Sequence, residues 1–227
     1  MNPDSVSVVI PAFNAARFIS DALESVLAQS VRTDEVLVVD DGSVDQTREV
    51  AGRFRGVQVL TTAHAGVSHA RNHGVRCSSG SWIAFLDADD TWHPDKLKKQ
   101  LAVASIAPET GVVMARQTYR FDCPVPAWFR GRQDGGSEPG FQPSNWLVRR
   151  STWEMVGQFD ESRTHSEDTD WLARARDLGV VVRAADFPLV VHRIHDANAS
   201  GMPAAVRSGV LSALRDSVQR KRETTNG

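Results

Sequence analysis

Two acidic segments stand out in the first ninety residues of this chain of 227 amino acids. Residues 40–43 read Asp-Asp-Gly-Ser and follow one apolar run, and residues 87–90 read Asp-Ala-Asp-Asp and follow another. The carboxyl ends of parallel strands meet at one edge of a sheet, where ligands bind in such folds, so both segments are expected there. Carboxylates gathered at one edge repel one another, and we expect a divalent cation or the guanidinium of Arg71 beside them.

The pair Asp87 and Asp89 suits a hard divalent cation. Mg²⁺ and Mn²⁺ take oxygen ligands and are often held by one or two carboxylates together with substrate phosphates. The alternative is structural, with Asp89 and Asp90 beginning a turn and capping the helix that follows. The second acidic segment on the same edge favours the metal site.

Asp41 and Arg71 have the chemistry to bind a nucleotide. A carboxylate at a strand end accepts hydrogen bonds from a ribose hydroxyl or a base N–H, although an ordinary turn also explains Asp-Gly-Ser. Arg71 lies on a predicted helix (66–78) that begins at the same edge, where base or phosphate oxygens would meet it. His69 and His73 have the i, i+4 spacing of a zinc pair, but no third ligand accompanies them, and zinc is not predicted.

Strands and helices alternate through the first half of the chain. Apolar runs predict strands at 6–10, 35–39, 57–60 and 81–86, and helical spacing predicts helices at 15–30, about 45–54, 66–78 and 94–106. This alternation predicts an α/β fold with a Rossmann-like, mostly parallel sheet and helices on both faces.

The second half is less regular. Strands are predicted at 112–115, 146–148, 180–182 and 189–191, and helices at 166–178 and 204–221. The segment 121–143 is rich in Pro and Gly and predicts a long loop, whose aromatic residues suit contact with an acceptor. The last helix is amphipathic and leads into a basic tail. Packing on the domain, a homodimer contact and a peripheral membrane contact all fit it.

Composition excludes several classes of protein. The chain has 26 Lys and Arg against 28 Asp and Glu, a balance that argues against a dedicated nucleic-acid binder. No apolar run reaches the roughly 18 residues of a membrane span, and the first residues lack the features of a signal peptide. Cys77 and Cys123 form neither a Cys-x-x-Cys pair nor a disulfide framework. We therefore expect a soluble, cytoplasmic protein.

Taken in order, the motifs resemble those of family 2 glycosyltransferases with the GT-A fold. The matching segments are 8–14 (VVIPAFN), 39–47 (VDDGSVDQT), 66–74 (GVSHARNHG), 85–90 (FLDADD), 157–161 (GQFDE), 166–171 (SEDTDW) and 191–195 (VHRIH). The resemblance implies one domain over residues 1–203. It has a nucleotide-binding half (1–116) and an acceptor-side half (117–203) with a small C-terminal extension. The helix and tail of 204–227 follow.

The resemblance also implies roles for individual residues. Those implied to bind the nucleotide sugar are Pro11, Ala12, Asn14, Asp41, Arg71, Asp87, Ala88 and His195. Among these, Asp41 and Arg71 would face the base and Asp87 the ribose. Asp89, together with His195, would hold a Mn²⁺ or Mg²⁺ that bridges the two phosphates. Asp168 would be the general base, with Glu167 as its neighbour.

The implied reaction inverts the anomeric centre and moves one sugar in each event, with UDP as the expected carrier. Processive polymer synthases carry Gln-x-x-Arg-Trp after the distal acid, whereas residues 169–172 here read Thr-Asp-Trp-Leu. An ordinary Asp is a weak base at neutral pH, so Asp168 should be buried or beside Glu167 to be useful. Alternatively, Asp168 is only a charge that favours a helix N-terminus. A sugar, a lipid-linked sugar, a peptide and a small metabolite all fit as acceptor.

Two other functions fit part of this pattern. Nucleotidyltransferases share the layout and the metal carboxylates, but they usually carry a glycine-rich segment after the first strand, where residues 11–14 read Pro-Ala-Phe-Asn. A non-catalytic module that binds a sugar nucleotide or a partner also fits the fold. Acidic residues are present at all three expected sites, as Asp41, Asp89 and Asp168, and this disfavours such a module.

Overall fold

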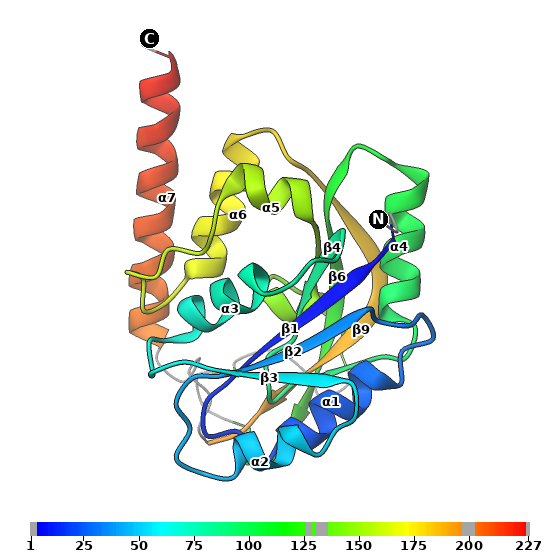
Figure 1. Cartoon of the computed structure of the whole chain (residues 1–227). Coiled ribbons are helices and arrows are strands. Elements are labelled where there is room, and N and C mark those ends of the chain that lie inside the picture. Colours follow the sequence, from blue (N-terminus) through cyan, green and yellow to red (C-terminus); the bar gives the residue numbers. More distant parts are fainter. Residues whose placement is uncertain (1–3, 126–128, 130–135, 197–202, 226–227) are drawn as a thin grey trace.

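The computed structural model describes residues 4–125, 129, 136–196 and 203–225. In these residues one sheet has the strand order β3-β2-β1-β4-β8-β6-β9-β5, and β7 pairs with β6. Helices lie against both faces of this sheet (Figure 1). The expected α/β class is therefore confirmed.

The first half of the chain forms the parallel part of the sheet. Its strands are β1 (Val6–Ala12), β2 (Glu35–Asp40), β3 (Val57–Thr61) and β4 (Trp82–Phe85). The connecting helices are α1 (Ile19–Leu27), α2 (Thr47–Gly52) and α3 (Val67–Arg76). Every residue of β1 is buried, as a strand between two helical layers requires. The order and type of these elements match the sequence predictions.

The second half adds strands of both directions. The elements are β5 (Thr91–Trp92), α4 (Lys96–Ile106), β6 (Thr110–Phe121), β7 (Glu138–Pro139), the short 3₁₀ helix η1 (Pro143–Asn145), β8 (Trp146–Arg149), α5 (Arg150–Val156), α6 (Glu167–Asp177), β9 (Val181–Ile194) and α7 (Pro203–Thr225). β8 is antiparallel to both β4 and β6, and β9 is parallel to β6. The parallel pairing that the sequence predicts thus gives way to a mixed sheet beyond β4. The expected division at residue 116 falls inside β6.

Some predicted elements differ from the structure. The strands predicted at 180–182 and 189–191 are parts of one long strand, β9. Its register against β6 shifts between Ala115, opposite Ala185, and Arg116, opposite Pro188. The polar and Pro-containing residues at this irregularity break the apolar pattern, which is why the sequence predicts two strands. The predicted loop 121–143 is shortened by β6 and β7, and its residues 126–128 and 130–135 lie outside the described part of the chain.

Each face of the sheet has its own apolar core. On one face α1, α2 and α4 pack on the sheet. On the other face α3, α5 and α6 pack through a group of aromatic rings that includes Trp146, Trp153 and Trp171. The ring of Trp171, on α6, lies 5.4 Å from that of Trp146 and 5.5 Å from that of Trp153. Burial of a large apolar side chain is worth about 1.5–3 kcal/mol, so these contacts fix α6 against the sheet.

Within the described residues, none of the helices combines the length and the apolar character of a membrane span.

Candidate active site

Arg71 joins two segments that are far apart in the sequence. Its guanidinium Nη2 donates to Asp87 Oδ1 at 2.7 Å and its Nη1 to Glu167 Oε1 at 2.7 Å. The residue is only 3% exposed. Burial alone would lower the pKa of Arg71, but the charges of Asp87 and Glu167 raise it above its ordinary value. The acidic segment after β4 is thereby held against the beginning of α6.

Asp168 lies next to this buried ion-pair network. It is the second residue of α6, after Glu167, and its side chain is half-buried. Burial and the negative charge of Glu167 raise the pKa of Asp168 to about 6, although a hydrogen bond from the Thr169 N–H opposes the shift. Ser166, just before the helix, has a left-handed backbone with φ of 63°. Asp168 therefore has the raised pKa that the sequence analysis requires of a base near neutral pH.

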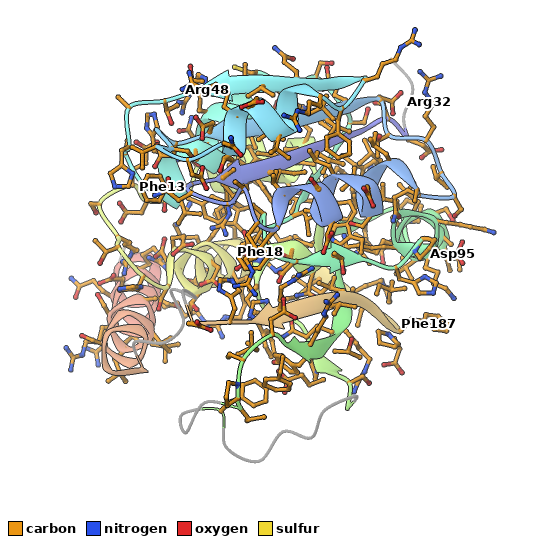
Figure 2. The ribbon with its side chains drawn as sticks, turned by 90° about the horizontal axis from the view of Figure 1, so that it is seen from below. Phe13, Phe18, Arg32, Arg48, Asp95 and Phe187 are labelled. Carbon is orange, nitrogen blue, oxygen red and sulfur yellow. The ribbon has the colours of Figure 1, made fainter. Side chains whose placement is uncertain are left out.

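Asp89 meets His195 on the other side of the acidic segment. His195 Nε2 lies 3.1 Å from Asp89 Oδ2. Burial would raise the pKa of Asp89, but the hydrogen bond from His195 and the charges of His192 and His195 lower it. The ring of His195 also packs on Phe18 at 4.3 Å between ring centroids, and Figure 2 shows Phe18 above β9. The carboxylate of Asp89 thus stays ionised next to an imidazole.

Asp90 and His192 form a second, deeper pair. His192 Nδ1 lies 2.8 Å from Asp90 Oδ1, which also accepts the Arg193 N–H at 3.1 Å. Burial would lower the pKa of His192, but Asp90 raises it to about 9. Since Asp90 is 1% exposed, this pair holds β9 to the acidic segment. His195, which the family resemblance implies as a site residue, is the histidine that reaches Asp89.

Sequence reasoning missed the role of Arg193 in this site. Its Nε donates to the Asp89 carbonyl at 3.1 Å, and its terminal nitrogens bind Asp21 at 2.6 Å and Asp122 at 3.0 Å. Arg193 lies inside the segment 191–195 on which the family resemblance rests, and that was the available signal. It fixes the backbone of Asp89 to α1 and to the end of β6.

Asp41 organises the neighbouring loop. Its carboxylate accepts hydrogen bonds from Thr62 Oγ1 at 2.6 Å, the Ala65 N–H at 2.8 Å and the Gly66 N–H at 2.7 Å. Burial would raise the pKa of Asp41, but these hydrogen bonds lower it. Gly66, the residue just before α3, has a φ of 95°, a conformation that glycine adopts without strain. Asp41 therefore sets where α3 begins, and α3 carries Arg71.

The end of β1 lies against the same loop. The Ala12 carbonyl accepts the Asp41 N–H at 2.8 Å, and Asn14 Oδ1 accepts the Val44 N–H at 3.0 Å. Phe13 is half-exposed and stacks on His64, with ring centroids 4.1 Å apart. Figure 2 shows Phe13 at the edge of the molecule.

Two further expected site residues have no polar side-chain atom, so they can offer a ligand only backbone groups and apolar contact. Pro11 is buried in β1, and Ala88 is 7% exposed between the two acids of the Asp-x-Asp pair. The Asp87 N–H donates to Ser144 Oγ at 3.0 Å, which fixes the acidic segment to η1.

The expected site residues form two linked groups. Arg71, Asp87, Glu167 and Asp168 share one network, and Asp89 belongs to the same short segment as Asp87. Pro11, Ala12, Asn14 and Asp41 form a second group at the ends of β1 and β2, linked to the first through α3. Ion pairs through Arg71 join the first group, and hydrogen bonds from Asp41 to the start of α3 connect the second group to it.

Asp89 and His195 suit a metal ion that the protein shares with substrate and water, rather than an ion held by protein ligands alone. In the described part of the chain, no group of three or more His, Cys, Asp or Glu side chains is arranged to hold a metal. Two protein donors leave most positions of an ion to be filled by phosphate oxygens and water, which is how Mg²⁺ is usually bound beside substrates. His69 bonds to Glu161 at 3.0 Å, and it too belongs to no such group.

In α/β proteins with an open parallel sheet, ligands bind outside the carboxyl ends of the strands, and the acidic segments of this chain lie there. The family model described as "Glycosyl transferase family 2" matches residues 7–161, which is more than half of the chain. This chain belongs to glycosyltransferase family 2.

Two curated relatives illustrate the similarity. The chain is 32% identical over 191 residues to "Glycosyltransferase AglE" of Haloferax volcanii, covering 77% of this chain and 62% of that protein. It is 41% identical over 101 residues to "UDP-Glc:alpha-D-GlcNAc-diphosphoundecaprenol beta-1,3-glucosyltransferase WfgD" of Escherichia coli, covering 43% of this chain and 40% of that one. The chain thus spans less than two thirds of the length of either relative.

A solved structure shows the same fold. The mannosyltransferase PcManGT from Pyrobaculum calidifontis, in complex with GDP-Man and Mn²⁺, has a TM-score of 0.76 and 18% sequence identity. The match covers 94% of this chain and 64% of that one. The likeness confirms the expected GT-A type of fold.

Proposed function

We propose that this chain transfers one sugar from a nucleotide diphosphate sugar to an acceptor hydroxyl or similar nucleophile, with inversion at the anomeric carbon. One observation carries the proposal. The buried guanidinium of Arg71 ties Asp87, in the acidic segment, to Glu167, the neighbour of the half-buried Asp168. This contact supports the proposal that a donor-side acid and a base act in one site.

The donor diphosphate would lie beside Asp89 and His195. These two residues would hold a Mn²⁺ or Mg²⁺, which when bound stabilises the negative charge that develops on the leaving phosphate. Pro11, Ala12, Asn14 and Asp41 would line the nucleotide end, with Asp87 and Ala88 between. UDP is the proposed carrier, which agrees with the name of WfgD, and the GDP-Man complex of PcManGT makes GDP the comparison to test.

Asp168 would act as the general base. The acceptor oxygen attacks the anomeric carbon as the bond from that carbon to the phosphate oxygen breaks, and the nucleoside diphosphate leaves with the electron pair. The acceptor proton passes to the carboxylate of Asp168 on the opposite face. Because the pKa of Asp168 is about 6, the group is mostly ionised at pH 7 yet more basic than an ordinary Asp.

Donor turnover tests this proposal directly. With Mn²⁺ and a panel of acceptors, the wild-type chain should release UDP from UDP-glucose or GDP from GDP-mannose, and Asp89→Ala should not. Asp186→Asn is a matched control, because its side chain is 86% exposed in the irregular middle of β9 and it should keep wild-type turnover. If no donor is turned over under any of these conditions, the alternative hypothesis of a non-catalytic module is correct and the proposal fails.

A further inference from the structure

Helix α7 docks on the domain through its polar side. Ser217 Oγ donates to Asp177 Oδ1 at 2.9 Å, Arg220 Nε donates to Asp177 Oδ2 at 3.2 Å, and Asp216 pairs with Arg163. Ala213, on the same side, is fully buried. In Figure 1, α7 runs along the outside of α6. Ion pairs and the small residue Ala213 therefore contribute to this contact.

Three large apolar side chains of α7 are exposed to solvent. Leu211 is 47% exposed, Leu214 is 44% exposed and Val218 is 51% exposed. With 3.6 residues per turn, the three lie within an arc of about 60° on the helix. This is the reverse of the usual arrangement, in which the apolar stripe of a surface helix faces the core.

Basic residues lie beside this apolar stripe. Arg215 and Arg222 are exposed and fall within about 40° of Leu211 around the helix. The sequence of α7 has five Arg or Lys and two Asp or Glu, in a chain whose net charge is −2. One of those two acids, Asp216, is paired with Arg163 on the docked side. Arg220 and Lys221 pair with Asp177 on the docked side. Arg215 and Arg222 give positive charge to the outer face of α7, defined here as Leu211, Leu214, Arg215, Val218 and Arg222.

Charge distinguishes between two possible partners of this face, a second copy of the chain and a lipid surface. A second copy bound across a two-fold axis would place the same face against itself, so that Arg215 and Arg222 would meet like charges. Anionic lipid headgroups offer the complementary charge, and the acyl boundary accepts the apolar stripe. A helix with an apolar side flanked by Arg or Lys is the type that lies in the plane of a membrane surface.

We propose that the outer face of α7 binds the surface of an anionic lipid bilayer. The same helix touches the segment that carries the candidate base. A Cβ at Gly209 would lie 2.7 Å from Ser166 Oγ and 2.9 Å from the His165 carbonyl oxygen, so α7 packs there without room for a side chain. Membrane binding through α7 would hold the beginning of α6 close to the lipid surface.

Vesicle flotation tests this proposal without any nucleotide. The wild-type chain should float with vesicles of phosphatidylcholine containing 30% phosphatidylglycerol in 50 mM salt, and bind far less to pure phosphatidylcholine. Each cation near an anionic surface is worth about fivefold in binding, so Arg215→Gln with Arg222→Gln should weaken binding at least tenfold. Leu214→Glu should weaken it through the apolar stripe. Ile106→Glu is the control, because Ile106 is an 85% exposed apolar residue on α4.

Three results would overturn the proposal. The first is absence of binding to the anionic vesicles, and the second is binding that the Arg215 and Arg222 changes leave intact. The third is a wild-type dimer, measured by light scattering, that Leu214→Glu converts to monomer, because the face would then bind a second copy. Thermal melting of each variant shows whether it is folded. Since no donor is present, failure here leaves the proposed transfer reaction untouched.

Discussion

Replacing Asp168 by Asn should separate catalysis from stability. The change keeps the shape of the side chain and removes a carboxyl whose pKa burial and Glu167 raise from 3.8 to about 6. Because the folded-state pKa is raised, the stability that Asp168 contributes is fully present below pH 3.8 and is lost as the pH rises through 6. At pH 8 the ionised group costs the folded state up to about 3 kcal/mol, and about half of this cost develops between pH 5 and pH 8.

Urea unfolding at pH 5 and pH 8 measures this cost. Asp168→Asn should be more stable than wild type at pH 8, by up to about 3 kcal/mol, with a smaller gain at pH 5. Asp186→Asn, the exposed control, should match wild type at both pH values. An Asp168→Asn variant that is less stable than wild type at pH 8 would refute the raised pKa and with it the reasoning about this site.

Turnover, unlike stability, should fall when Asp168 is replaced by Asn. Loss of a general base typically costs on the order of 10²–10⁴-fold in rate. In the wild type, turnover should fall about tenfold per pH unit below pH 6, as Asp168 becomes protonated. An Asp168→Asn variant with wild-type turnover would show that another group is the base.

Three further changes test the parts around the base. Arg71→Met should destabilise the fold by about 3–5 kcal/mol in urea, because it leaves the buried Glu167 and the partly buried Asp87 without a counter-ion. An unchanged unfolding midpoint would contradict the buried network. Gly74→Ala should cost about 1–3 kcal/mol, since a Cβ there would lie 2.4 Å from Val9 Cγ1, whereas Gly52→Ala, with nothing within 4 Å, should stay within about 1 kcal/mol of wild type. Removing divalent ions with EDTA should abolish detectable UDP binding in calorimetry, and binding that persists would argue against a shared metal ion.

The fold was most predictable where the sequence pattern was continuous. Runs such as Val6–Ala12 are apolar throughout because they are buried on both faces, so their type and order follow from the sequence alone. β9 was misread as two strands because its exposed, irregular middle around Asp186 carries no apolar pattern. α5 was not predicted, since a helix of seven residues offers too few turns for a clear period.

The site was predictable in its residue types but not in its pairings. The motifs identify Arg71, Asp87 and Glu167, yet nothing in their spacing shows that one guanidinium binds both acids, because Glu167 lies 96 residues beyond Arg71. That pairing depends on how α6 packs through Trp171. The expectation that Arg71 faces the nucleobase of the donor stays a prediction, and so does the cytoplasmic location.

Calorimetric titration of UDP and GDP in the presence of Mn²⁺ tests most directly whether Asp89 and Asp168 have separate donor and base roles. We expect at least one nucleotide to bind the wild-type chain, Asp89→Ala to lose this binding and Asp168→Asn to retain it. Equal affinity in Asp89→Ala and wild type, or loss of binding in Asp168→Asn, would contradict the separation of donor and base roles.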